Sequence, residues 1–144
     1  MKVLVDTSIW SLALRRKPHQ LNAEQQRLKE AFAKLISEHR VVMIGPVRQE
    51  LLSGLRSERT FKVLKQALRA FDDAPLKTED FEEAARAYNQ CRASGVSATP
   101  IDLLMCAVAQ RLSVAIFTTD KDFSRYAKLL PIRLYNVSAG LTEQ

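Results

Sequence analysis

The sequence predicts an α/β fold, a three-layer sandwich whose central parallel sheet is covered by helices on both faces. Three short runs, at residues 3–5, 41–44 and 114–117, contain only apolar side chains, as strands buried on both faces do. Longer segments with helical periodicity separate these runs, which favours parallel strands joined by right-handed helical connections. The low content of turn-forming residues, 4 Gly and 5 Pro, disfavours a turn-rich β-sandwich or barrel.

Length and composition predict one globular domain over residues 1–144. The chain has 47% hydrophobic and 26% charged residues, which excludes a wholly disordered, collagen-like or coiled-coil protein. No apolar run approaches the ~18 residues of a membrane span, and the amino terminus has no apolar signal-peptide core. We therefore expect a cytoplasmic protein without a membrane partner. Cys91 and Cys106 lie in apolar helical patterns without metal-ligand spacing and are expected to be buried thiols.

Helices are expected after each of the first two strands. Asp6 is positioned to cap a short helix directly after the first strand. Apolar residues at helical spacing then predict a helix between residues 21 and 36. Gly45 and Pro46 end the second strand, and Pro46 suits the first turn of a helix that ends near Gly54.

The second half of the chain shows four further helical patterns and a fourth strand. The clearest helix start combines Thr99 as N-cap with Pro100 at the first helical position. Gly95 is expected to stop the helix before it. The expected helices cover residues 61–71, 78–95, 100–112 and 122–127, and the expected strand covers residues 132–134.

Acidic residues occur where this fold would bring chain segments together. Asp6 directly follows the first strand, and Asp120 follows the third strand after two threonines. Glu50 lies on the helix that leaves the second strand, Asp102 lies in the first turn of the helix that enters the third, and Asp122 comes shortly after Asp120. Ligands of open parallel sheets gather beyond the carboxyl ends of the strands, so these carboxylates can converge at one edge.

Each acidic residue also has a purely structural interpretation. Asp6 can cap a helix, and Asp102, three residues after a threonine, can form a capping box. Glu50 can be a solvated helix residue. Asp120 can initiate a turn, while Asp122 can cap the next helix. These interpretations stay open for each residue taken alone.

The group as a whole indicates a metal site. Several carboxylates at close range stay ionised together only when a cation compensates their charge. Mg²⁺ and Mn²⁺ prefer oxygen ligands, and His19 and His39 lie in polar stretches where surface positions are expected. A carboxylate-held metal suits phosphoryl chemistry, because it lowers the pKa of bound water and neutralises charge on the leaving oxygen.

The chain resembles PIN-domain ribonucleases, and most closely the VapC-type toxins of type II toxin–antitoxin systems. The resemblance extends from residue 1 to about residue 134 and rests on four motifs in a fixed order. The motifs are Val-Leu-Val-Asp6-Thr7-Ser8, Glu50-Leu51-Leu52-Ser53-Gly54, Pro100-Ile101-Asp102, and Phe117-Thr118-Thr119-Asp120-Lys121-Asp122-Phe123.

This resemblance implies a PIN-like fold and a Mg²⁺- or Mn²⁺-dependent endoribonuclease that hydrolyses RNA phosphodiesters with a metal-activated water. It implies that Asp6, Asp102 and Asp120 bind the metal. Glu50 completes the catalytic quartet, either as a further ligand or by positioning the water. The implied supporting residues are Thr7 or Ser8, Thr119, and Asp122.

Basic residues can supply the contacts to RNA. The chain carries 22 basic and 16 acidic residues, a net charge of +6, and phosphate contacts dominate nucleic-acid affinity. Arg15, Arg16 and Lys17 form the densest basic run, and Arg48 lies near the Glu50 helix. A solvated basic surface is the alternative interpretation for each of them.

The resemblance also implies protein partners. VapC-type toxins are commonly homodimers, and a cognate VapB-type antitoxin holds them inactive by laying a carboxyl-terminal segment across the toxin. We expect that segment to dock on the helices of residues 21–68.

Three other functions remain to be separated from a toxin ribonuclease. A housekeeping PIN nuclease would lack an antitoxin partner, and a non-catalytic metal- or RNA-binding module would not need all four acids. A receiver-type phosphoacceptor domain would need an acidic pair at the first strand, where Asp6 stands alone after Val-Leu-Val.

Overall fold

The central sheet of the computed structural model, which describes residues 1–137, has three parallel strands in the order β2-β1-β3. Strand β1 pairs in register with β3, placing Val3 opposite Ala115 and Val5 opposite Phe117. This pairing aligns the carboxyl ends of the two strands. The strands are β1 (Val3–Val5), β2 (Val41–Val42) and β3 (Ala115–Phe117).

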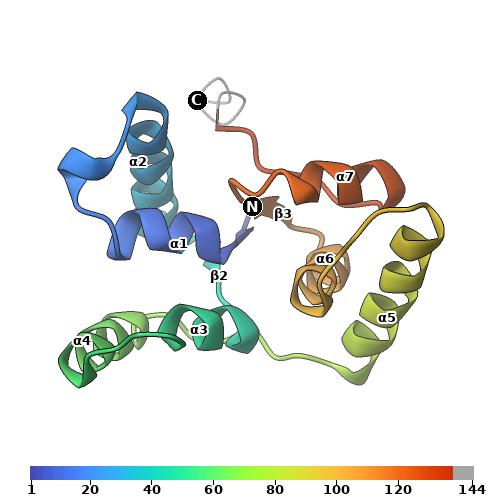
Figure 1. Cartoon of the computed structure of the whole chain (residues 1–144), viewed down its shortest axis with the longest axis horizontal. Coiled ribbons are helices and arrows are strands. Elements are labelled where there is room, and N and C mark those ends of the chain that lie inside the picture. The colour runs from blue at the N-terminus through green and yellow to red at the C-terminus, as the bar shows by residue number, and fades with distance from the viewer. Residues whose placement is uncertain (138–144) are drawn as a thin grey trace.

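Helices flank the sheet on both sides, which confirms the predicted three-layer α/β fold. Figure 1 shows α1 to α4 on one side of the strands and α5 to α7 on the other. Over residues 1–137, no helix combines the length and the apolar content that a bilayer-spanning segment needs. The helices are α1 (Thr7–Leu14), a 3₁₀ turn (Pro18–Gln20), α2 (Ala23–Ser37), α3 (Gly45–Leu52), α4 (Glu58–Leu68), α5 (Thr78–Ala93), α6 (Pro100–Leu112) and α7 (Asp122–Leu129).

Two of the predicted strands differ from the structure. The second strand ends at Val42, and Met43 makes an isolated bridge to Asp73. The fourth strand, predicted at residues 132–134, is wrong, because Leu134 makes only one bridge to Ile116. The N–H of Ile132 is bonded to Leu130 O at 2.8 Å in a local turn, so the segment pairs with β3 only briefly. Residues 138–144 of the predicted domain lie outside the described residues.

The helix boundary signals are confirmed. Thr99 Oγ1 accepts the backbone N–H of Asp102 at 3.1 Å, so Thr99 caps α6, and Pro100 is the first helical residue. Gly95 follows α5 with a φ of 75°, a left-handed conformation that glycine adopts without strain. Cys91 and Cys106 are buried free thiols, as predicted, and burial raises the pKa of Cys106 to about 12.

Trp10 anchors α1 to the sheet. Its indole Nε1 donates a hydrogen bond to Val5 O at 3.2 Å, and its side chain is only 1% exposed. The ring makes edge contacts with Phe32 of α2 and with Phe71, at centroid distances of 4.8 and 4.9 Å. These contacts fix α1, which carries Ser8, relative to β1.

An ion pair with a buried carboxylate joins α5 and α6, two of the helices on the other side of the sheet. Asp80 of α5, 2% exposed, accepts two hydrogen bonds from the Arg111 guanidinium of α6 at 2.7 and 2.9 Å. Arg111 also donates to Pro75 O at 2.9 Å. The hydrogen bonds from Arg111 lower the pKa of Asp80 below its ordinary value of 3.8, against the opposing effect of burial.

Replacing Asp80 by Asn is expected to lower the free energy of unfolding by about 2–3 kcal/mol at neutral pH. This is less than the ~3–5 kcal/mol of a fully buried pair, because Arg111 retains contact with solvent. Because the folded-state pKa is lowered, the ion pair stabilises the fold above pH 3.8 and loses that effect as the pH falls through the folded value. Urea denaturation at several pH values measures the difference.

The exposed pair Glu83–Arg86 provides the matched control. Arg86 Nε and Glu83 Oε1 are 3.8 Å apart, and both side chains are more than half exposed. Glu83→Gln should therefore lower the free energy of unfolding by less than about 0.5 kcal/mol. An Asp80→Asn variant as stable as the wild type at neutral pH would contradict the role of the ion pair.

Candidate active site

Asp6 lies where the sheet edge and α1 meet. It is the first residue after β1, is only 7% exposed, and donates its backbone N–H to Phe117 O of β3 at 2.9 Å. The strand pairing therefore brings Asp6 directly beside the segment that leads from Phe117 to Asp120. This places two of the sequence-predicted carboxylates at one edge of the sheet.

Two hydroxyl groups hold the Asp6 carboxylate in place. Ser8 Oγ and Thr118 Oγ1 donate hydrogen bonds to Asp6 Oδ2 at 2.7 and 2.8 Å. The same two oxygens accept the backbone N–H groups of Thr119 and Asp120, at 3.0 and 2.9 Å respectively. Because an ionised carboxylate can only accept hydrogen bonds, the hydroxyl protons point to Asp6.

One oxygen of Asp6 remains available. No hydrogen bond among the described residues reaches Oδ1, while Oδ2 also accepts the N–H of Ser8 at 3.4 Å. The capping interpretation of Asp6 is therefore correct for Oδ2, and it leaves Oδ1 free for a ligand. The structural and functional interpretations of this residue are compatible, because each uses a different atom.

The structural interpretation of the sequence is correct for Asp120 and wrong for Asp122. Asp120 Oδ1 accepts the N–H of Asp122 at 2.9 Å and so stabilises the turn that starts α7, as expected. Of the two interpretations left open for Asp122, the one as a helix cap is wrong. Asp122 is the first helical residue, and its side chain pairs with Arg125 at 3.2 Å.

Asp102 reaches the site from α6. The capping box expected with Thr99 is only half formed, because the Asp102 side chain does not return to the Thr99 N–H. Its Oδ2 instead accepts a hydrogen bond from the hydroxyl of Tyr126 at 3.0 Å. Tyr126 lies on α7 and is fully buried, so its hydroxyl fixes the orientation of the carboxylate.

The three aspartates share an electrostatic environment. The pKa of Asp102 is raised from 3.8 to about 6, first by burial and then by the charges of Asp6 and Asp120, against the lowering effect of the Tyr126 hydrogen bond. Burial, followed by the charge of Asp102, also raises the pKa of Tyr126. In the described chain, no basic side chain forms an ion pair with these three carboxylates.

This donor set suits a hard cation in its chemistry. It offers carboxylate oxygens, an excess of negative charge and an unoccupied acceptor on Asp6. Within residues 1–137, no group of three or more acidic, histidine or cysteine side chains is already arranged to hold a metal ion. Glu50 lies exposed on α3 and makes no hydrogen bond or ion pair with the described residues.

The remaining predicted polar residues separate into two groups. Ser8 and Thr119 join the hydrogen-bond network at Asp6. Thr7 does not, and its buried Oγ1 has no partner among the described residues. Thr118 and Tyr126 were not predicted as site residues. Thr118 could have been, because it directly follows β3, at the edge of the sheet where ligands are expected. The contact between Tyr126 and Asp102 joins two different helices, so no local pattern could indicate it.

Of the predicted RNA-binding residues, Arg16 borders a pocket beside the site. This pocket, called here the α1–α2 pocket, is also lined by Ser8, Thr118 and Thr119, and by Lys121, which the sequence did not single out. Arg15 and Lys17 are exposed but do not line it.

Arg48 has a structural role in addition to the predicted one. Its guanidinium donates to Asp73 at 2.9 Å, to Leu68 O at 3.0 Å and to Phe71 O. These bonds hold the segment after α4 against α3. An RNA contact by Arg48 stays a prediction.

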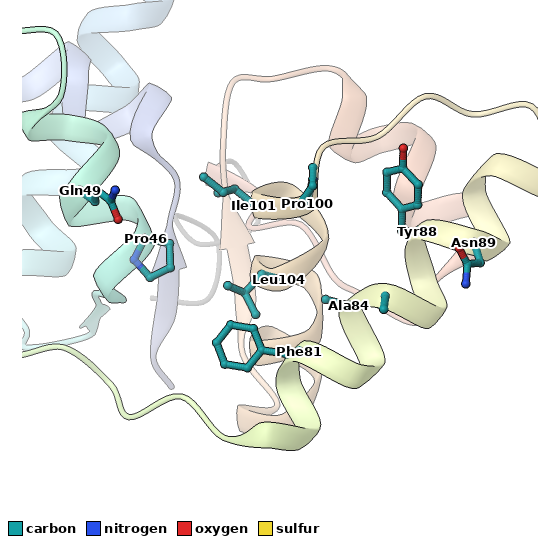
Figure 2. A pocket seen from close by; sticks show the side chains of 10 residues that line it. Pro46, Gln49, Phe81, Ala84, Tyr88, Asn89, Pro100, Ile101 and Leu104 are labelled. Atoms are coloured by element: carbon teal, nitrogen blue, oxygen red, sulfur yellow. The ribbon is translucent and has the colours of Figure 1, made fainter.

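An apolar groove lies between α3, α5 and α6. Figure 2 shows Phe81 reaching from α5 toward Leu104 of α6, with Pro46 of α3 across from them. Three large apolar side chains of the groove are exposed: Phe81 at 54%, Ile101 at 37% and Tyr88 at 36%. Because Ile101 precedes Asp102, the groove ends close to the acidic site.

Replacing Asp102 by Asn is expected to stabilise the metal-free protein. A folded-state pKa of about 6 means that ionised Asp102 destabilises the fold above that pH. We expect a gain of about 1–2 kcal/mol at about pH 7.5, after allowing for solvent screening. The gain should shrink as the pH falls from 6 toward 3.8, because the wild-type carboxylate then protonates.

Thermal melts in EDTA at two pH values measure this effect. Asp72→Asn serves as the control, because Asp72 is exposed and makes no hydrogen bond or ion pair with the described residues. An Asp102→Asn variant that melts below the wild type at about pH 7.5 would contradict the prediction that the ionised Asp102 carboxylate destabilises the metal-free fold.

Comparison with known proteins agrees with the fold described above. The PIN domain model matches residues 3–129. Ribonuclease VapC11 of Mycobacterium tuberculosis is 29% identical over 129 residues, which cover 88% of this chain and 92% of the relative. The FitAcB structure from Neisseria gonorrhoeae aligns with a TM-score of 0.73 and 21% identity over 94% of this chain and 98% of the other. The VapBC-1 structure from nontypeable Haemophilus influenzae aligns with a TM-score of 0.70 and 14% identity, covering 96% and 99%. Because the family match covers nearly the whole chain, this protein belongs to the PIN domain family.

Proposed function

We propose that this chain is a Mg²⁺- or Mn²⁺-dependent endoribonuclease that acts in the cytoplasm as the toxin of a VapBC-type pair. The observation that carries the proposal is that the charges of Asp6 and Asp120 act on the Asp102 carboxylate, while no basic side chain of the described residues forms an ion pair with any of the three. The name of the mycobacterial relative, a VapC ribonuclease, supports the same activity.

The residues divide the work according to their contacts. Asp6 Oδ1, Asp102 and Asp120 would hold the cation, and Glu50 would complete the set from α3. When bound, Mg²⁺ or Mn²⁺ supplies positive charge at the scissile phosphate and lowers the pKa of a water molecule. Ser8 and Thr118 keep Asp6 in one orientation throughout.

Asp102 makes the site sensitive to pH. Below its pKa of about 6 the carboxyl group carries a proton, and a protonated carboxyl group is a poor cation ligand. Tyr126 orients the same carboxylate by its hydrogen bond. Arg16 and Lys121 stand beside the site and would neutralise phosphates of the bound RNA strand.

Replacing Asp6 or Asp120 by Asn should reduce RNA cleavage by more than about 100-fold, because loss of a direct ligand should exceed the ~10–100-fold cost of an outer-shell change. The assay measures cleavage of a labelled pool of tRNA, rRNA and mRNA with Mn²⁺, with Mg²⁺ or with EDTA. Wild-type cleavage should require the metal.

The exposed Asp72→Asn variant is the matched control and should cleave like the wild type. Circular dichroism confirms that each variant is folded. Full activity of the Asp120→Asn variant, with unchanged metal dependence, would refute the proposed site. If the folded wild type cleaves no RNA of the pool with either metal, the result would contradict the proposed ribonuclease activity.

We further propose that two copies of the chain pair through the apolar groove of Figure 2. The exposed Phe81, Tyr88 and Ile101 concentrate apolar surface there, and exposed apolar patches mark protein interfaces. The antitoxin segment would dock elsewhere, on the helices of residues 21–68. Leu52, Phe61 and Phe71 line a hollow associated with that stretch.

Replacing Phe81 by Glu should convert the dimer to a monomer, because it places a charge in the centre of an apolar contact. Light scattering after gel filtration measures the mass of both proteins. Tyr135→Phe, a change outside the groove, should not alter it. A wild-type protein that is monomeric at high concentration would contradict this interface.

A further inference from the structure

We propose that the α1–α2 pocket binds a guanine base of single-stranded RNA next to the cleaved phosphodiester. This inference rests on the proposed ribonuclease function and identifies a base-reading subsite for it. The pocket has a volume of about 630 Å³, within the range of about 300–1,000 Å³ typical of small-ligand sites.

The position of the pocket couples it to the catalytic carboxylates. Ser8, Thr118 and Thr119 line it, and the hydroxyls of Ser8 and Thr118 are bonded to Asp6. A base in this pocket would therefore contact the same side chains that hold the Asp6 carboxylate. The nucleotide that it belongs to would be adjacent to the reacting phosphate.

The start of α2 presents a defined set of hydrogen-bonding groups. Asn22 Oδ1 accepts the N–H of Gln25 at 2.8 Å, and Gln25 Oε1 accepts the N–H of Asn22 at 3.0 Å. This reciprocal cap engages both amide oxygens, so the two NH₂ groups are left as donors. Glu24, between them in sequence, is exposed and makes no hydrogen bond or ion pair with the described residues.

These groups match guanine better than the other bases. Guanine is the only RNA base whose Watson–Crick edge presents two adjacent donors, N1–H and the N2 amino group, beside an acceptor, O6. The carboxylate of Glu24 can accept from both donors, while an NH₂ group of Asn22 or Gln25 donates to O6. Adenine, cytosine and uracil each place an acceptor where Glu24 needs a second donor.

The rest of the pocket suits a nucleotide. Leu12 and Leu28 supply an apolar wall for the face of a base. Arg16 and Lys121 supply positive charge for the flanking phosphates and offset the charge of Glu24. Sequence-specific RNA recognition usually reads splayed, unpaired bases through such edge contacts.

The first test is a base-preference profile. A randomised single-stranded RNA pool is cleaved by the wild type, by Glu24→Gln and by Glu30→Gln, and the fragment ends are sequenced. Glu30 lies on the same helix, is exposed, and is outside the pocket. We expect guanine to be enriched at one position within two nucleotides of the cut. The enrichment should be lost in Glu24→Gln and kept in Glu30→Gln.

The second test removes a single donor from the base. Inosine lacks the N2 amino group of guanine, so a cleaved oligonucleotide with inosine at the enriched position loses one contact to Glu24. The wild-type kcat/KM should fall by about tenfold, the scale of one lost base contact. For Glu24→Gln the guanine and inosine substrates should be cleaved at nearly equal rates, which a merely structural role of Glu24 would not produce.

The outcomes separate this inference from the ribonuclease proposal. Metal-dependent cleavage without guanine enrichment, or with enrichment that survives in Glu24→Gln, would overturn the base subsite and leave the nuclease intact. If no RNA is cleaved, fluorescence anisotropy with guanine- and inosine-containing 12-mers in EDTA decides. Tighter guanine binding that Glu24→Gln abolishes would support the subsite, and equal binding of both oligonucleotides would overturn it. Displacement of RNA by an Arg-rich peptide, with no base preference, would assign the pocket to a protein partner.

Discussion

The parallel pairing of β1 with β3 is the constraint on which the site depends. It joins the N–H of Asp6 to Phe117 O and so brings together segments more than 100 residues apart in the chain. From there, Thr118 Oγ1 bonds the Asp6 carboxylate and receives the N–H of Asp120. The position of one carboxylate thus fixes the backbone that carries the second. A change of register between these short strands would separate the two carboxylates from each other.

The protein handles its buried acidic groups in two ways. Asp80 is paired with Arg111, which lowers the pKa of Asp80 and stabilises the packing of α5 on α6. Asp102 has no such partner, and its pKa is raised by burial and by neighbouring carboxylates. Hydrogen bonds from Tyr126 and Thr99 offset only part of that effect. Unbalanced charge is costly for a fold, and its concentration at one edge is typical of a binding or catalytic site.

Much of this arrangement could be predicted from the sequence because it depends on local signals. Apolar runs located the three strands, Thr99 and Pro100 marked the start of α6, and carboxylates after strands indicated the site. The contacts that complete the site join distant elements, as Tyr126 does with Asp102, and periodicity carries no such information. Arg48 shows the same limit, because its bonds to the segment after α4 depend on tertiary packing. The strand predicted at residues 132–134 was wrong because the apolar pattern of this segment gives no sign of the turn that bonds Ile132 to Leu130.

A crystal structure of the protein soaked with Mn²⁺ would show whether the three aspartates bind a metal, because the anomalous signal of manganese locates the ion independently of any assay. We expect one ion or more within ligand distance of Asp6 Oδ1, Asp102 and Asp120, with the Asp6 side chain still bonded to Ser8 and Thr118. Soaking above about pH 6 favours binding, because Asp102 is then ionised before the metal arrives. Manganese bound elsewhere on the molecule, with this edge of the sheet empty at saturating concentration, would show that these carboxylates are not a metal site.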